Sequence, residues 1–303
     1  MDENGPEGAP APWAQVRIQV SPPAQEGLAN LLLELGAGGL LVQEEGLPHP
    51  CLSAYFPSDS QLPSTLQALA RYLSSLAEMG LDPGPQKLEV LPWRDRGESE
   101  RWKDFFKPLL LGRRLVIKPS WEWYEADPED LVLEMDPGRA FGTGRHPSTA
   151  ICLRFLERRV QGGERILDLG AGSGILAIAA AKLGARAVTA LEIDPPSAKI
   201  ARENVNRNGL MDQVEVREGT LSDLPREIFD LCVANLTLEE ILPLLPALRA
   251  LLGDRRGVLF LSGILREEMG SLRRSLEAAD LSVKEWEVQR EWAGLGAWKR
   301  ERN

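Results

Sequence analysis

The chain has 303 residues, of which 43% are hydrophobic, and a formal net charge of −10 at pH 7. This length favours two domains with substantial cores, while the acidic balance argues against a broad nucleic-acid surface, which needs clustered Lys and Arg, and suits a basic protein partner. We expect a cytoplasmic protein without a targeting or membrane segment, because the N-terminus is acidic and Pro-rich and no apolar run is long enough to span a bilayer.

Residues 1–13 are predicted to be a disordered tail, and residues 14–92 a small α+β domain. The segments alternate in the order strand, helix, strand, strand, helix, strand, which is typical of a ferredoxin-like fold. The predicted strands lie at 14–20, 38–45, 51–57 and 86–92, and the predicted helices at 24–36 and 62–80. This half carries no cofactor motif, so we interpret it as a recognition or docking domain. A common scaffold without a specific role is the alternative.

A charged segment follows, and residues 93–112 are predicted to form a helical linker. Trp102, Phe105 and Phe106 lie at helical spacing within it, which indicates a packing face rather than a ligand site. The cysteines do not mark a site either, because they are scattered and lack the spacing of a zinc site or of a disulfide framework; they are Cys51, Cys152 and Cys232. We therefore expect no metal.

Residues 113–303 show a different organisation, in which strands alternate with helices. This pattern predicts an α/β domain with a mainly parallel, doubly wound sheet, and the close pair of terminal strands predicts an antiparallel edge. The predicted strands are 113–121, 130–136, 165–170, 187–194, 214–220, 229–235, 257–263, 282–291 and 296–301, and the helices are 147–159, 173–184, 195–209, 238–253 and 267–280.

The glycine motif DLGAGSG at 168–174 lies where the first strand of this sheet ends and a helix begins. Gly170, Gly172 and Gly174 allow a sharp turn and a close approach of the backbone to a ligand. A dinucleotide fingerprint requires a glycine at 175, which is Ile175 here, whereas the spacing G-x-G-x-G is typical of S-adenosylmethionine enzymes. Turn glycines without a ligand are the alternative.

Two further positions follow neighbouring strands. Glu192 lies about twenty residues beyond Gly170, where an acid can accept hydrogen bonds from both ribose hydroxyls. Asp194 is the rival, but it precedes Pro195 and is explained more simply as a helix cap. Asn235, in VANLT at 233–237, can offer its side-chain oxygen to a nitrogen donor while its amide is held by backbone. A plain turn asparagine is the alternative.

Together these motifs resemble the PrmA family of class I S-adenosylmethionine enzymes, which methylate large-subunit ribosomal protein L11. The similarity runs from about Glu98 to the C-terminus and includes ERWKDFFKPLLLGRRLVIKPSWE, DPGRAFGTGRHPSTAICLRFLE, ILDLGAGSGILAIAAAKLGA, EIDPPSAKIARENVNRNG, VANL and LSGIL. The resemblance implies a Rossmann-like class I methyltransferase domain with a seven-stranded sheet over 113–303. It also implies that 14–92, which matches more loosely, is the substrate-recognition domain.

The resemblance also implies the activity and the residues that carry it. The expected reaction transfers methyl groups from S-adenosylmethionine to lysine side-chain or N-terminal amines of ribosomal protein L11. The implied cofactor contacts are Thr149, Gly170, Gly172, Glu192 and Asn235, and Asn235 is also the expected catalytic residue. Glu192 stands where an Asp is expected, and it keeps the charge with a longer reach. Methyl transfer to an amine needs positioning more than a strong base.

A second glycine-rich stretch, FGTGRHPST, is expected to fold over the methionine part of the cofactor. Its candidate residues are Phe141, Gly142, Thr143, Gly144 and His146. Phe141 is interpreted equally as channel wall or as packing. His146 is interpreted equally as a residue that orients the loop or contacts substrate and as one that makes local hydrogen bonds at the helix entry. We assign neither of them as a general base.

The expected partner is the free ribosomal protein, with no direct nucleic-acid or membrane contact, and we expect a monomer. Related enzymes methylate lysines of the electron-transfer flavoprotein beta subunit, but they resemble only the catalytic half. An assembly factor that binds S-adenosylmethionine without turnover is a further alternative. The intact set of Gly170, Glu192 and Asn235 weighs against it. Glutamine and adenine amino methyltransferases carry Asn-Pro-Pro-Tyr, whereas Leu236 follows Asn235 here.

Overall fold

The computed structural model describes residues 13–35, 37, 39–43, 49–58, 62–78, 82–93, 107–135, 144, 146–225, 227–253 and 257–300. Contacts divide the chain into a first unit, 1–107, and a second unit, 108–303. Trp13 already belongs to the first strand, and the remainder of the predicted tail lies outside the described residues. Within the described part of the chain, no helix is both long and apolar enough to cross a membrane.

The first unit is a four-stranded antiparallel sheet with two helices. Its elements are β1 (Trp13–Gln19), α1 (Pro22–Glu34), β2 (Gly39–Gln43), β3 (Cys51–Pro57), α2 (Leu62–Glu78) and β4 (Lys87–Trp93). The strand order is β2-β3-β1-β4, and each pair is antiparallel. This order, with the chain sequence βαββαβ, is the predicted ferredoxin-like topology.

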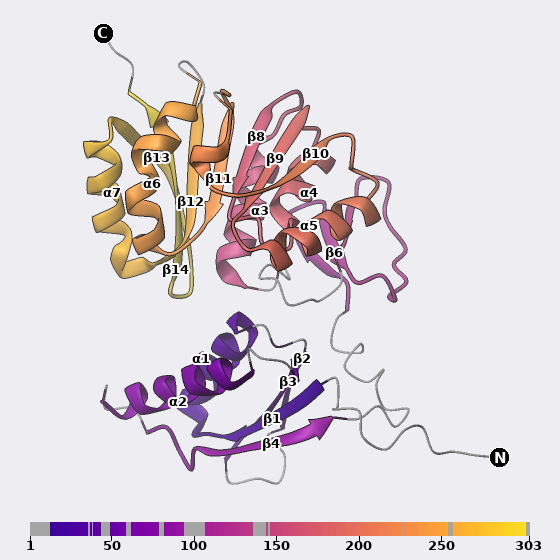
Figure 1. The fold of residues 1–303 in the computed structure, drawn as a ribbon, viewed down its shortest axis with the longest axis vertical. Helices are drawn as coiled ribbons and strands as arrows, with labels where there is room; N and C mark the ends of the chain where they lie inside the picture. The colour runs from indigo at the N-terminus through magenta and orange to yellow at the C-terminus, as the bar shows by residue number, and fades with distance from the viewer. Residues whose placement is uncertain are drawn as a thin grey trace, which may run out of the picture. The chain divides into compact units, whose positions relative to one another are not determined.

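Period-2 alternation explains why β1 forms here and which face it buries. Val16 and Ile18 are fully buried, and they pack with apolar residues of both helices, such as Leu28 of α1 and Leu69 of α2. Figure 1 shows α1 and α2 together on one side of the sheet. The intervening polar residues of β1, Gln15, Arg17 and Gln19, therefore lie on the opposite face.

The second unit contains a seven-stranded sheet with the order β10-β9-β8-β11-β12-β14-β13. Its strands are β8 (Arg165–Leu169), β9 (Ala187–Glu192), β10 (Val214–Glu218), β11 (Leu231–Asn235), β12 (Val258–Leu265), β13 (Leu281–Gln289) and β14 (Trp292–Lys299). The first five in this order are parallel, and β14 is antiparallel to both of its neighbours. The structure confirms the predicted parallel sheet with an antiparallel hairpin at its edge.

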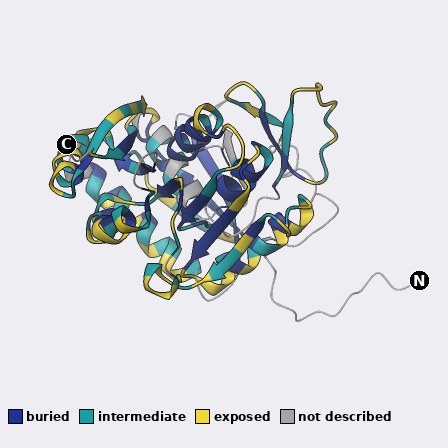
Figure 2. Ribbon diagram, turned by 90° about the horizontal axis from the view of Figure 1, so that it is seen from above, coloured by how far each residue is buried: buried dark blue, intermediate teal, exposed yellow. Residues whose placement is uncertain are grey.

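Helices cover both faces of this sheet. They are α3 (Pro147–Arg159), α4 (Ile175–Lys182), α5 (Pro195–Arg207), α6 (Leu238–Leu251) and α7 (Met269–Ala278), with short 3-10 turns η2 (Leu221–Asp223) and η3 (Arg266–Glu268). One core cluster contains residues of α3 and α4, and the other contains residues of α6 and α7. Because both faces are covered, the central strands are buried (Figure 2).

The strands before α3 form a separate sheet. β5 (Leu109–Leu111) pairs antiparallel with β6 (Leu115–Lys118), which pairs parallel with β7 (Leu131–Glu134). The prediction of a helix over 93–112 is therefore wrong at 109–111, and residues 94–106 lie outside the described part. The Glu157 carboxylate accepts hydrogen bonds from the Arg113 and Arg114 N–H groups, at 2.8 and 2.7 Å, and fixes the β5–β6 turn against α3.

Candidate active site

The site lies where the strand order reverses. From β8 the chain continues outward to β9 and then β10 on one side, whereas β11 and β12 follow on the other side. Neighbouring loops leave the carboxyl ends of β8 and β11 in opposite directions, which opens a crevice at this edge of a doubly wound sheet. Gly170 directly follows β8, and Asn235 is the last residue of β11. The topology therefore brings two of the predicted site residues to one edge.

The glycine turn has the left-handed backbone that its sequence predicts. Gly170, Gly172 and Gly174 have φ values of 71°, 54° and 81°. The turn is tied down because the Gly170 N–H donates to the Leu191 carbonyl at 2.9 Å, and the buried Asn204 side chain donates to the Ser173 carbonyl at 2.9 Å. A Cβ at Gly170 would lie 2.7 Å from Cδ2 of Leu236. Backbone conformation and close approach therefore both require glycine at this position.

We expect Gly170→Ala to lower the free energy of unfolding by about 2–4 kcal/mol, since it combines a left-handed alanine with overlap on Leu236. Gly163→Ala is the matched control, because Gly163 has φ 92° and nothing within 4 Å of an added Cβ. Gly163→Ala should lower the free energy of unfolding by about 1 kcal/mol, because only the left-handed backbone conformation disfavours alanine there. Urea unfolding of both variants measures the difference. Equal decreases in the free energy of unfolding would show that the Leu236 side chain moves aside without a measurable cost.

Glu192 closes β9 beside the glycine turn. Its carboxylate accepts hydrogen bonds from the Gly172 N–H at 2.8 Å and from the Asp194 N–H at 3.0 Å, and the residue is 8% exposed. Each oxygen retains further acceptor capacity for a ligand hydroxyl. Asp194 instead caps α5, since its carboxylate accepts from the Ser197 N–H at 3.0 Å and from the Ser197 hydroxyl at 2.6 Å. The capping interpretation of Asp194 is confirmed.

Asn235 presents an oxygen without a protein partner. Its amide nitrogen donates to the Thr149 hydroxyl at 3.2 Å, and its Oδ1 is buried with no hydrogen bond among the described residues. Thr149 is 1% exposed and lies in the first turn of α3. The amide is thus held by a side chain, whereas the sequence analysis expected backbone. A buried acceptor left unpaired costs free energy, so its retention indicates a ligand donor.

The loop before α3 is described only in part. Phe141, Gly142 and Thr143 lie outside the described residues. Gly144 has φ 79°, and a Cβ there would overlap the Ile117 side chain. His146 is the N-cap of α3: its Nδ1 accepts from the Ser148 N–H at 3.3 Å, and its ring lies edge-on to Trp292 at 4.6 Å between centroids. The structure thus shows the local hydrogen bonding that was one interpretation of His146.

Asp168 is a buried site residue that the sequence analysis did not single out. It is 0% exposed; Oδ2 accepts from the Ala177 N–H at 3.0 Å, and Oδ1 has no hydrogen bond within the described part of the chain. Burial raises the pKa of Asp168 to about 7, the Ala177 N–H opposes the increase, and the charge of Glu192 adds to it. The signal in the sequence is an acid two residues before the first glycine.

We expect Asp168 to contribute to the free energy of unfolding at low pH and this contribution to be lost as the pH rises toward 7. Its folded-state pKa lies above the value of about 3.9 in an unfolded chain, so the folded protein binds more protons between these values. Asp168→Asn removes this dependence. The stability of the variant relative to wild type should therefore rise by a few kcal/mol between pH 4 and pH 8, at about 1.4 kcal/mol per unit of pKa difference. Chemical unfolding of both proteins at each pH measures it, and a constant difference would contradict the assignment.

Ile193 is a second residue that the sequence analysis missed. It lies between Glu192 and Asp194 and is 70% exposed at the edge of the sheet. The Gly219 N–H donates to the Glu192 carbonyl at 2.9 Å, which brings the turn after β10 beside it. An exposed apolar side chain next to a ribose-type acceptor is what a purine ring would cover. The sequence signal is an isoleucine between two acids.

The donor and acceptor set fits S-adenosylmethionine. Asp168 Oδ1 is buried and lacks a protein donor among the described residues, and a Cβ would fill the turn at Gly170. The amino group of the cofactor can donate to Asp168 and its ribose hydroxyls to Glu192. Asn235 Oδ1 is a second buried oxygen without a hydrogen bond in that part of the chain. The cysteines Cys51, Cys152 and Cys232 are free and buried. Among the described residues, no group of His, Cys, Asp and Glu side chains is arranged to hold a metal.

Comparisons with known proteins agree with this geometry. The family model described as Ribosomal protein L11 methyltransferase (PrmA) matches residues 12–300. A ribosomal protein L11 methyltransferase of Pelotomaculum thermopropionicum is 36% identical over 310 residues, covering 94% of this chain and 98% of the relative. One of Geobacter metallireducens is 36% identical over 294 residues, covering 93% and 97%. The crystal structure of a ribosomal protein L11 methylase from Lactobacillus delbrueckii subsp. bulgaricus superimposes with a TM-score of 0.60 at 33% identity, covering 65% of this chain and 100% of that one.

Proposed function

Because the chain belongs to the ribosomal protein L11 methyltransferase (PrmA) family, we propose that it methylates lysine side-chain amines, the N-terminal amine, or both, of ribosomal protein L11. It is an S-adenosylmethionine-dependent protein N-methyltransferase. When bound, the cofactor would supply an electrophilic methyl group on its sulfonium, whose carbon a neutral amine attacks while the sulfur leaves as a neutral thioether. The observation that carries the proposal is the buried oxygen of Asn235 at the carboxyl edge of the sheet, which has no hydrogen-bond partner in the described part of the chain.

Glu192 and the glycine turn would bind the nucleoside part of the cofactor. The Glu192 carboxylate would accept hydrogen bonds from the ribose hydroxyls, and Gly170 and Gly172 would let the backbone lie against the ligand. Ile193 would cover one face of the adenine. Asp168 would offer Oδ1, which has no hydrogen bond among the described residues, to the amino group of the methionine part, and a cation there would lower the pKa of its carboxyl again. The loop containing Phe141, Gly142, Thr143 and Gly144 is proposed to close over that part.

Asn235 would orient the amine that accepts the methyl group. Its Oδ1 accepts an amine N–H, so the nitrogen lone pair is directed at the methyl carbon, and Thr149 fixes the amide in this orientation. Positioning of this kind lowers the barrier without a strong base. A lysine must first lose its proton from a pKa of about 10.4, and removal from water lowers that pKa. His146 is therefore not needed as a general base.

We propose that the free ribosomal protein, rather than assembled ribosomes, is the substrate. The enzyme has 45 acidic and 35 basic residues, so it attracts a basic protein but repels RNA. We propose that the enzyme acts as a monomer without direct contact to nucleic acid. It would act in the cytoplasm, where ribosomal proteins are made and assembled. Residues 14–92 are proposed to present the substrate. Intact large subunits that compete as well as the free protein would contradict the proposal.

Two alternatives are not favoured. A lysine methyltransferase of the electron-transfer flavoprotein beta subunit would not account for the family match over the first half of the chain, which begins at residue 12. A cofactor-binding assembly factor without turnover would have no need of a buried acceptor at Asn235. Both hypotheses predict no methyl transfer to ribosomal protein L11, so the same assay tests them.

Intact-mass spectrometry tests the proposed function. Ribosomal protein L11 from cells that cannot methylate it is incubated with the enzyme and S-adenosylmethionine. We expect mass increases in steps of one methyl group, and peptide mapping then assigns them to lysine side chains or to the N-terminus. An unchanged mass, in a sample whose cofactor binding has been verified by calorimetry, would refute the proposal.

A further inference from the structure

One face of the first unit's sheet is polar and lies opposite both helices. Along β1, Gln15, Arg17 and Gln19 alternate with buried Val16 and Ile18, whose side chains pack under α1 and α2. Gln15 also donates to the Tyr55 hydroxyl of β3 at 3.3 Å. Among the described residues of this unit, no helix covers this face. Gln15, Arg17 and Gln19 are half-buried on this face, whereas the β3 residues that pair with Arg17 and Gln19, Ser53 and Cys51, are buried there.

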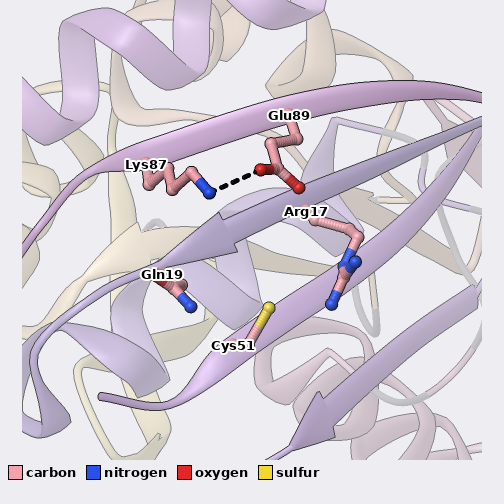
Figure 3. A pocket seen from close by; sticks show the side chains of 5 residues that line it. All are labelled: Arg17, Gln19, Cys51, Lys87 and Glu89. Carbon is pink, nitrogen blue, oxygen red and sulfur yellow. Dashed lines mark ion pairs between the residues drawn. The ribbon is translucent and has the colours of Figure 1, made fainter. Parts of the chain in front are cut away.

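A pocket of about 250 Å³ lies on this face. It is lined from three neighbouring strands by Arg17, Gln19, Cys51, Lys87 and Glu89 (Figure 3). The strand register explains the grouping, because Arg17 pairs with Glu89, and Gln19 pairs with Lys87 on one side and with Cys51 on the other. Drug-sized ligands occupy pockets of about 300–1,000 Å³, so this volume suits a single side chain better than a nucleoside.

The charges of this pocket differ from those of the surrounding unit. Residues 13–93 contain eight acidic residues and only three basic ones, Arg17, Arg71 and Lys87. Two of the three basic residues line the pocket. Lys87 is neutralised by Glu89, whose carboxylate lies 2.7 Å from its Nζ, and this hydrogen bond lowers the pKa of Glu89. Within residues 13–93, basic side chains are therefore concentrated at the pocket, and five further Lys and Arg residues of the unit follow at 94–107.

Arg17 is the cation in this pocket that makes no hydrogen bond or ion pair among the described residues, although its charge also lowers the pKa of Glu89 on the paired strand. The residue is half-buried. A guanidinium presents five donors in a planar fork that matches a carboxylate with two parallel hydrogen bonds. Gln19 follows Arg17 on the same face of β1, and its side-chain amide supplies a second, neutral hydrogen-bond donor.

We propose that the pocket binds the carboxylate of an aspartate or glutamate side chain on the methylated protein, with Arg17 as the bidentate donor and Gln19 as the second contact. This inference rests on the proposed function, since it assigns the carboxylate to the protein substrate. A nucleic acid is disfavoured, because the eight acidic residues of 13–93 outnumber its three basic ones, and this balance repels a polyanion. The acidic unit would likewise repel an acidic segment of the substrate protein. The pocket therefore selects a single carboxylate on a basic or neutral surface of the substrate, and this contact fixes the orientation in which the substrate docks.

Steady-state kinetics with Arg17→Gln test this proposal. We expect the KM for ribosomal protein L11 to rise by about 10- to 100-fold, the range of one lost charge-assisted pair, with kcat and the dissociation constant of S-adenosylmethionine unchanged. Arg71→Gln is the matched control, because it makes the same change of charge in the same unit but on the exposed surface of α2; its KM should stay within about twofold. Arg17→Lys, which keeps the charge without the fork, should give an intermediate KM.

The partner carboxylate is identified by replacing each acidic residue of the ribosomal protein with its amide. One replacement should reproduce the effect of Arg17→Gln and add nothing further when combined with it. Equal KM values for Arg17→Gln and Arg71→Gln would overturn the proposal, as would reduced RNA binding by Arg17→Gln with an unchanged KM. A wild-type enzyme that does not methylate the protein refutes the proposed function itself, so the two failures are distinguishable.

Discussion

Asn235→Ala should lower kcat for methyl transfer by about 100-fold or more, because it removes the acceptor that is proposed to orient the amine. The Asn235 oxygen is buried and has no hydrogen bond among the described residues, so no protein donor competes with the amine for it there. The dissociation constant of S-adenosylmethionine should change by less than about tenfold, since the nucleoside part is held elsewhere. Single-turnover transfer to ribosomal protein L11, with cofactor binding measured separately by calorimetry, distinguishes the two effects.

Thr149→Val is the companion to this variant. It removes the hydroxyl that accepts from the Asn235 amide at 3.2 Å but leaves Oδ1 in place. We expect a smaller loss of kcat, of about tenfold, because the oxygen is present but less well oriented. If Asn235→Ala retained the kcat of wild type, Asn235 would be a plain turn residue and the assignment of the acceptor oxygen would be wrong.

Glu192→Gln is expected to weaken S-adenosylmethionine binding by about 10- to 100-fold or more. Hydrogen bonds to charged groups contribute about 1.5–3 kcal/mol, and the substitution replaces a carboxylate with a neutral amide that has one oxygen. That oxygen must also serve the Gly172 and Asp194 N–H groups, which the carboxylate satisfies with both of its oxygens. Titration calorimetry with S-adenosylmethionine and with S-adenosylhomocysteine measures the effect.

Glu203→Gln is the matched control for Glu192→Gln. It makes the same substitution on α5, where Glu203 is exposed and its carboxylate lies 3.9 Å from Lys199 in an i,i+4 pair. An exposed pair of this kind contributes little, so cofactor affinity should not change. Glu192→Asp keeps the charge with a shorter reach and should bind more tightly than Glu192→Gln. Equal affinities of Glu192→Gln and Glu203→Gln would exclude Glu192 from the ribose site.

The local elements of this protein could be predicted because their signals are local. Asp194 and Pro195 begin α5, and α3 begins with Pro147 in its first turn, as the sequence indicates. The glycine turn follows from residues that lie side by side in the chain. The helical prediction for 93–112 failed at 109–111 for the converse reason: β5 forms by pairing with β6, and its turn is fixed by Glu157, more than forty residues away.

The alternation of strands and helices, the glycine turn and the acid that ends β9 could be predicted from the chain, because each depends on neighbouring residues and on a period of 2 or 3.6. Which atoms are left for a ligand depends instead on contacts between distant segments. The pKa of Asp168 is raised because the sheet and α4 bury its carboxyl group. The Asn235 amide is oriented by Thr149, which lies 86 residues away in the sequence. The Arg17 pocket likewise needs three strands in register. Burial and partner choice arise from contacts between distant segments, so no local pattern specifies them.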